Sequence, residues 1–139
     1  MSEIKRNDKF YTVNQIALAA FIGGPLGGTI LLAKNYQGLG ASRSASRAVV
    51  CGLLFTFALV PVALILPERT PRIALPLGYT IALRIIAERL QAAEINARIN
   101  AGDLQQSWWL TLGLTIIACL ATAIILTVGM VIALPFFVR

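Results

Sequence analysis

The feature that most constrains this chain is the length of its uncharged stretches. Three of them, residues 12–33, 48–67 and 107–138, contain no Asp, Glu, Lys or Arg and are mostly apolar. At about 1.5 Å per helical residue, 20 residues reach about 30 Å, the thickness of the hydrocarbon core of a bilayer. The sequence therefore predicts an all-α integral membrane fold rather than a water-soluble domain.

The composition agrees with this prediction. The chain is 58% hydrophobic and 13% charged, whereas soluble domains are about half apolar and about a quarter charged. A soluble chain of this size buries only about 70% of its surface, so it could not hide so much apolar area from water. The net charge of +6 comes from basic residues that punctuate the apolar runs, without the basic, aromatic-rich stripe of a nucleic-acid site. We therefore expect a lipid bilayer, and no nucleic acid, as a partner.

A single membrane domain over residues 1–139 with about four hydrophobic segments is expected. The first, 12–33, has glycines and a proline at its centre, which predicts a break or a tight kink. The second, 48–67, is expected to span the bilayer. The last, 107–138, is the strongest span, because aromatic residues stand at both of its ends, as in interfacial belts. These aromatics are Trp108, Trp109, Phe136 and Phe137, followed by Arg139.

The third segment, 73–87, is short for an independent crossing and contains Pro76 and Arg84. Apolar residues then recur at helical spacing, which predicts an amphipathic extension to about residue 100 and a stop at Gly102. Three interpretations of this extension stay open: a helix on the membrane surface, a docking face for a partner, or a solvated continuation of a membrane helix.

Residues that carry catalysis are missing. The chain has no histidine, no phosphate-binding glycine motif and no metal-ligand spacing, and Cys51 and Cys119 lie apart inside apolar runs. The six acidic residues fall at expected termini, loops or interfacial surfaces. We therefore expect no catalytic residue, no metal, no cofactor and no enzyme activity.

Arg84 is the one charged residue well inside an apolar run, and such a residue is by default a functional hypothesis. In that interpretation it holds an anionic lipid or an acidic group of a partner. In the simpler interpretation, which we favour, its side chain reaches the headgroups or pairs with Glu88 four residues later.

A glycine cluster lies at the centre of the first segment, with two ladders of small residues four apart: Ala19, Gly23 and Gly27, and Ala20, Gly24 and Gly28. Small residues at this spacing let helices approach closely. Packing within the chain is the first interpretation and a partner interface the second. In the third, a broken backbone binds an ion or a substrate, as in transporters. The candidate site residues are Gly23, Gly24, Pro25, Gly27 and Gly28.

Residues 10–40, FYTVNQIALAAFIGGPLGGTILLAKNYQGLG, resemble the start of small bacterial multi-pass inner-membrane proteins. The shared features are an apolar GGPLGG-containing segment and a KNY before a glycine, with a looser likeness in SWWLTLG near residue 107. The resemblance covers about the first third of the chain. It implies a location in the bacterial inner membrane and no particular activity.

Two functions are expected from these features. The first is a non-catalytic protein that binds a partner within the bilayer, another membrane protein or a second copy of itself, as an accessory subunit or an immunity-type protein would. The alternative is a small homo-oligomeric transporter or channel, built on the broken first segment and Arg84.

Orientation is predicted from the positive-inside rule. If all four segments cross, the basic residues divide evenly. If the first segment is a re-entrant hairpin, nine basic residues lie on one side and three on the other. If the third segment lies in the interface instead, the division is eight to four. Both uneven arrangements put the N-terminus and residues 88–107 in the cytoplasm and the C-terminus outside, and they differ on the sides of Ser44 and Thr70.

Overall fold

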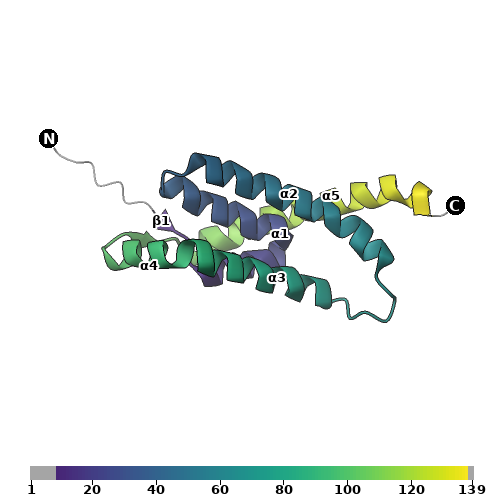
Figure 1. Cartoon of the computed structure of the whole chain (residues 1–139), viewed down its shortest axis with the longest axis horizontal. Helices are drawn as coiled ribbons and strands as arrows, with labels where there is room; N and C mark the ends of the chain where they lie inside the picture. Colours follow the sequence, from purple (N-terminus) through teal and green to yellow (C-terminus); the bar gives the residue numbers. More distant parts are fainter. Residues whose placement is uncertain (1–8, 138–139) are drawn as a thin grey trace.

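The structure, a computed structural model, describes residues 9–137 and consists almost entirely of helices (Figure 1). The elements in chain order are β1 (Lys9–Phe10), α1 (Val13–Gly38), α2 (Ser42–Ile65), α3 (Ala74–Ala87), η1 (Glu88–Ala92), α4 (Ala93–Asn100), β2 (Leu104–Gln105) and α5 (Trp108–Phe137). The predicted all-α fold is confirmed. The side chains from Phe136 onward, including Arg139, lie outside the described part.

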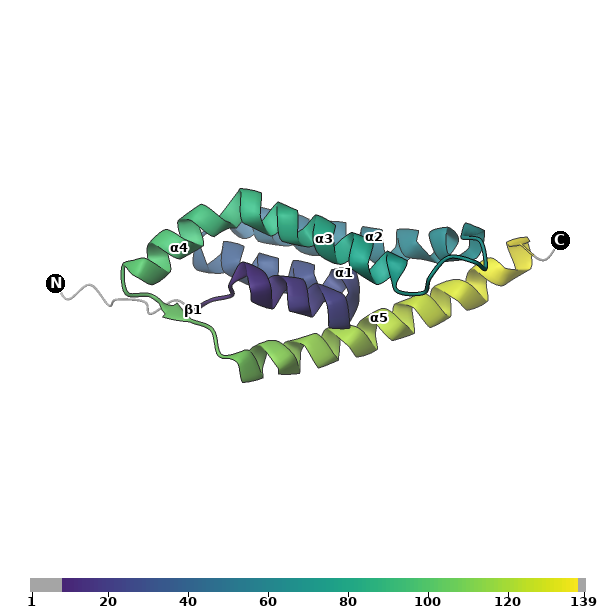
Figure 2. The same cartoon turned by 90° about the horizontal axis from the view of Figure 1, so that it is seen from below.

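The first hydrophobic segment is a helical hairpin that reverses at Gly24, where φ is 73° and ψ is −175°. The backbone N–H of Tyr11 donates to Oδ1 of Asn35 at 2.8 Å, although these residues would be about 36 Å apart along a straight helix. Figure 2 shows the two arms of α1 running side by side. The predicted break is therefore a complete reversal of direction.

Local chemistry explains both the start and the reversal of α1. Thr12 and Gln15 form a capping box at the N-terminus of the first arm. Gly24 adopts a positive φ that other residues rarely accept. Pro25 then opens the second arm, where its missing N–H costs no helical hydrogen bond and its fixed φ suits the first turn.

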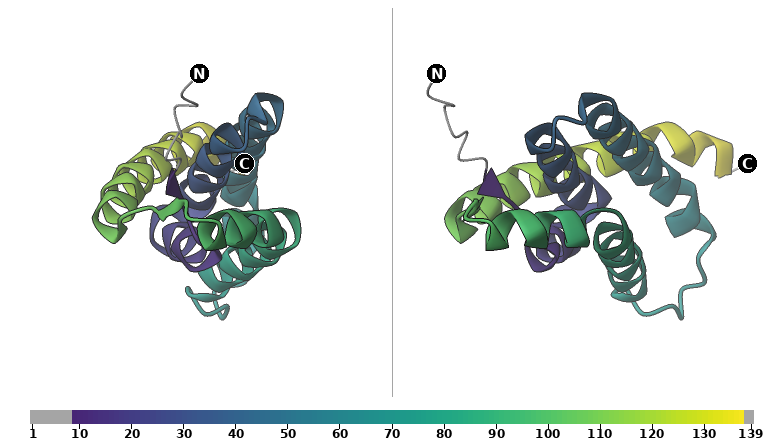
Figure 3. Two further views of the ribbon diagram at one scale, coloured as in Figure 1. Left: turned by 90° about the vertical axis from the view of Figure 1, so that its left-hand side faces the viewer. Right: turned by 60° about the vertical axis from the view of Figure 1, so that its left-hand side comes forward.

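The hairpin is the centre of the molecule. α2, α3 and α5 each pack mainly on α1, and α2 and α3 make little contact with each other. Figure 3 shows the hairpin enclosed by the other helices. α5 faces it with a stripe of small residues: Thr111, Thr115, Ala118 and Thr122 are all buried. The hydroxyl of Thr122 donates to the carbonyl of Gly23 at 2.9 Å, which joins α5 to the turn of the hairpin.

Three helices are long and apolar enough to cross a membrane: Val13–Gly38, Ser42–Ile65 and Trp108–Pro135. For α1 this holds only by length and composition, because the chain reverses at Gly24 and each arm reaches only about 16–21 Å. The helical extension predicted for the third segment is confirmed. η1 is one turn of π-helix that joins α3 to α4, so residues 74–100 form one continuous helical rod of about 40 Å along its axis, which bends where α3 and α4 join (Figure 2). Gly102, with φ of 106°, follows its end.

The two ends of the molecule carry different parts of the chain (Figure 2). One end gathers β1, the turn between α1 and α2, and α4 with β2, while the other holds the loop between α2 and α3 and the end of α5. β1 and β2 form a parallel two-residue pair, with Lys9 opposite Leu104 and Phe10 opposite Gln105. This pair could not be predicted from the sequence, because two residues are too few for a strand pattern.

Candidate functional site

The glycine cluster packs against the chain's own atoms. A Cβ added at Gly23 would lie 3.0 Å from the carbonyl oxygen of Thr115 in α5. One added at Gly28 would lie 2.9 Å from Cβ of Ala20 in the opposite arm and 3.0 Å from Cδ1 of Leu83 in α3. Gly27 approaches the carbonyl of Ala19 in the same way. These contacts are the intrachain packing that was the first of the three interpretations.

The reversal changes what the two ladders mean. On an unbroken helix, residues four apart form one stripe, but here Ala19 and Ala20 lie opposite Gly27 and Gly28 across the hairpin. Gly24 instead faces Thr122 of α5. All four glycines and Pro25 are buried, and Pro25 also lines the groove between α2 and α3 that is described below. A role in binding a partner or a transported ion at these residues stays a prediction.

A cluster of buried amides, absent from the sequence-based candidates, joins the elements at one end of the hairpin. Asn35 takes the N–H of Tyr11 on Oδ1, and its Nδ2 donates to the carbonyl of Tyr11 at 2.8 Å and to Oε1 of Gln91 at 3.2 Å. Nε2 of Gln91 donates to the carbonyl of Leu32 at 3.1 Å. The two amides therefore join the second arm of α1 to η1 and to Tyr11, which directly precedes the first arm.

A third amide ties the same end to α5. Nε2 of Gln15 donates to the carbonyl of Gln106 at 2.8 Å and to the hydroxyl of Thr111 at 3.1 Å. Gln15, Asn35 and Gln91 are at most 1% exposed, and buried polar groups without such partners would be costly. Burial also raises the pKa of Tyr11. In the sequence, each of these amides stands near the end of an apolar run. Nothing in the sequence identified their hydrogen-bond partners.

Arg84 points outward from α3 and pairs with Glu88, with Nε 2.9 Å from Oε1. Both side chains are about half exposed. The pairing four residues apart, expected in the simpler interpretation, is present. Contact of Arg84 with a lipid or a partner stays a prediction, and the structure does not bring Arg84 together with the glycine cluster, since its neighbour Leu83 is the residue that reaches Gly28.

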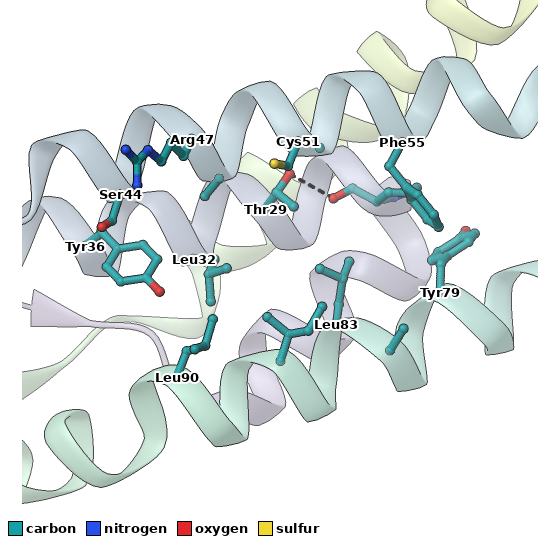
Figure 4. A pocket seen from close by; sticks show the side chains of 15 residues that line it. Thr29, Leu32, Tyr36, Ser44, Arg47, Cys51, Phe55, Tyr79, Leu83 and Leu90 are labelled. Atoms are coloured by element: carbon teal, nitrogen blue, oxygen red, sulfur yellow. Dashed lines mark hydrogen bonds between the residues drawn. The ribbon is translucent and has the colours of Figure 1, made fainter.

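A groove lies between α2 and α3, over the second arm of α1 (Figure 4). It exists because α2 and α3 pack on α1 and hardly on each other. Its cavity of about 470 Å³ falls within the range of small-ligand sites, about 300–1,000 Å³. The apolar wall includes Leu32, Ala48, Phe55, Ala82, Leu83, Ile86 and Leu90.

The two ends of the groove differ. Tyr36 of α1 and Ser44 and Arg47 of α2 line the end nearest the turn between these helices, and Phe55 and Tyr79 face each other at the far end (Figure 4). Beyond Phe55 and Tyr79 lies a separate cavity of about 270 Å³, which the same two residues also line. The groove is therefore apolar along its length, polar and cationic at one end, and bounded by aromatic rings at the other.

Sequence reasoning did not find the groove, because its residues come from four elements, α1, α2, α3 and η1, that are far apart in the chain. Pro25 of the glycine cluster and Tyr36 of the KNY motif are among its lining residues. Within residues 9–137 no group of His, Cys, Asp or Glu is placed to hold a metal ion. The groove offers apolar contact along its length and, at one end, the guanidinium of Arg47 with the hydroxyls of Tyr36 and Ser44. These groups suit the binding of a ligand rather than catalysis. Comparison with family models, with curated protein sequences and with solved structures finds no match to this chain.

Proposed function

We propose that this chain is a non-catalytic, multi-pass protein of the bacterial inner membrane that binds a partner within the bilayer through the α2–α3 groove. The groove is the observation that supports the proposal, since it lies between α3 and α2, and α2 is long and apolar enough to cross a membrane. Leu54 on α2 and Ile81 on α3, the sequence neighbours of the lining residues Phe55 and Ala82, are 64% and 55% exposed, so we expect a partner to reach the groove from the lipid. An accessory subunit or an immunity-type protein would act in this way.

The alternative of a transporter or channel has less support. It relied on free backbone groups at the broken first segment, but the carbonyl of Gly23 accepts the Thr122 hydroxyl and the glycines pack against neighbouring side chains. The Gly23 carbonyl, one of the groups expected to bind an ion, is thus engaged within the chain.

A photoreactive phenylalanine analogue tests the groove in native membranes. Placed at Phe55, which lines the groove, it is expected to give a discrete adduct with a protein or a lipid. The matched control is Ile117 on α5, which is 65% exposed and outside the groove. The proposal is contradicted if both positions give the same diffuse pattern of adducts.

Orientation has its own test. In the proposed arrangement α1 is a re-entrant hairpin and the N-terminus is cytoplasmic, so Ser44 faces the cytoplasm and Thr70 the outside. Single cysteines at these positions, in a background without Cys51 and Cys119, are labelled in intact cells with an impermeant maleimide. Labelling at Thr70 alone is expected. Labelling at Ser44 alone would contradict this orientation.

A further inference from the structure

The length of the groove limits what fills it. From Tyr79 to Leu90 the α3–η1 rod advances by about 16 Å, at about 1.5 Å per residue. This is about half the thickness of a hydrocarbon core of about 30 Å, which is the depth of one leaflet. Phe55 and Tyr79 close the groove at that depth (Figure 4). A chain that enters from the polar end thus meets a wall near the middle of the bilayer.

This limit distinguishes a lipid from a partner helix. A helix that spans the bilayer is about 10–12 Å wide and follows the whole core, so it would extend well past the Phe55–Tyr79 wall. A single acyl chain needs only apolar contact over one leaflet. The walls offer this along the groove, with Leu32, Leu83, Ile86 and Leu90 on the α1 and α3 sides.

The polar end supplies the charge. Arg47 is exposed and forms no salt bridge with any residue of 9–137, so its charge is not neutralised within the described chain. Tyr36 and Ser44 lie beside it in Figure 4 and add hydroxyl donors. A guanidinium binds phosphate oxygens through paired N–H groups, and basic pockets between membrane helices bind anionic headgroups.

We infer that the groove binds an anionic phospholipid, with one acyl chain between α2 and α3 and the phosphate at Arg47, Tyr36 and Ser44. The inference rests on the proposed function, which makes the groove the binding site. It adds that the partner is a lipid, that the lipid belongs to the leaflet on the side of the α1–α2 turn, and that Arg47 selects an anionic headgroup.

The test uses the full chain reconstituted in nanodiscs of phosphatidylcholine and phosphatidylglycerol, then released and analysed by native mass spectrometry. The wild type is expected to retain a phospholipid and to enrich phosphatidylglycerol several-fold over its share in the nanodisc. Arg47→Gln is expected to abolish the enrichment. Ala82→Trp, which fills the groove from α3, is expected to reduce retention of both lipids.

Matched controls separate the groove from general surface effects. Arg43→Gln removes a similar exposed charge one turn earlier on α2, and Ala123→Trp adds the same bulk on an exposed position of α5. Both are expected to retain lipid as the wild type does. Size-exclusion profiles and helical content establish that each variant is folded, and the two groove variants act by different routes, so failure of one to fold leaves the other decisive.

Two results would overturn the inference. One is equal enrichment in the wild type and Arg47→Gln, or equal losses in Arg47→Gln and Arg43→Gln. The other is a Phe55 adduct that contains a protein and no lipid, which would refute the lipid while leaving the proposed binding function intact. If Phe55 and Ile117 give the same adducts, the binding function itself fails.

Discussion

α1 and α5 are both long and apolar enough to cross a membrane, but they occupy opposite environments. In α1, 72% of the apolar window is buried inside the molecule, whereas in α5 only 11% is. α1 carries the glycine cluster and the buried amides, while α5 presents large apolar side chains outward, with Ile117 65% and Ile124 64% exposed. The helix richer in large apolar residues is thus the one on the outside.

The physical reason is that lipid is as apolar as leucine. In a bilayer, burying a large apolar side chain gains little, and helices associate through close packing and hydrogen bonds instead. Small residues and amides therefore collect at the centre, as they do in α1. The comparison predicts that substitutions in α1 affect folding, while matched substitutions on the outward face of α5 do not.

The largest effect is expected for Gly24→Leu. Gly24 has a positive φ, and an added Cβ would lie 2.9 Å from Cγ2 of Thr122. Backbone strain of about 1–3 kcal/mol and overpacking of about 1–3 kcal/mol add up, so folded yield in mild detergent is expected to fall sharply. Gly113→Leu on α5 is the control, because nothing lies within 4 Å of its added Cβ. Equal folded yields for the two variants would contradict the expected difference between α1 and the outward face of α5.

An intermediate effect is expected for Asn35→Ala. It leaves the backbone N–H of Tyr11 and Oε1 of Gln91 without their Asn35 partner, and each buried unpaired group costs about 1–3 kcal/mol. Thermal unfolding in detergent is expected to begin at a clearly lower temperature. Asn14→Ala, at an exposed amide of the same helix, is expected to leave it unchanged. A variant at Asn35 as stable as the one at Asn14 would show that the amide cluster does not hold the hairpin.

The smallest measurable effect is expected for Thr122→Val, which keeps the shape but removes the hydroxyl that donates to the carbonyl of Gly23. Hydrogen bonds between membrane helices contribute about 0.6 kcal/mol on average and up to about 1.7 kcal/mol. Thr127→Val is the matched control, since the exposed Thr127 donates only to Ala123 of its own helix. Chemical unfolding in mixed micelles measures both. Identical unfolding midpoints for the two variants would show that the Thr122 hydrogen bond does not stabilise the packing of α5 on α1.

Composition and local pattern were enough for the helical elements. The uncharged runs determine that these segments are helical, because backbone groups away from water must bond within a helix. The Gly-Gly-Pro run determines a break, because Gly24 tolerates a positive φ and Pro25 opens a new helix. The Arg84–Glu88 pair is likewise local, since four residues make one helical turn.

The angle of the break, the amide cluster and the groove were decided only by tertiary structure. Nothing in the pattern of residues 12–33 separates a kink from a reversal, since both need the same Gly and Pro. The reversal is held by contacts between residues far apart in the chain, such as Gln15 with Thr111 and Asn35 with Gln91. The groove has the same origin, because it is the space left where α2 and α3 pack on α1 rather than on each other.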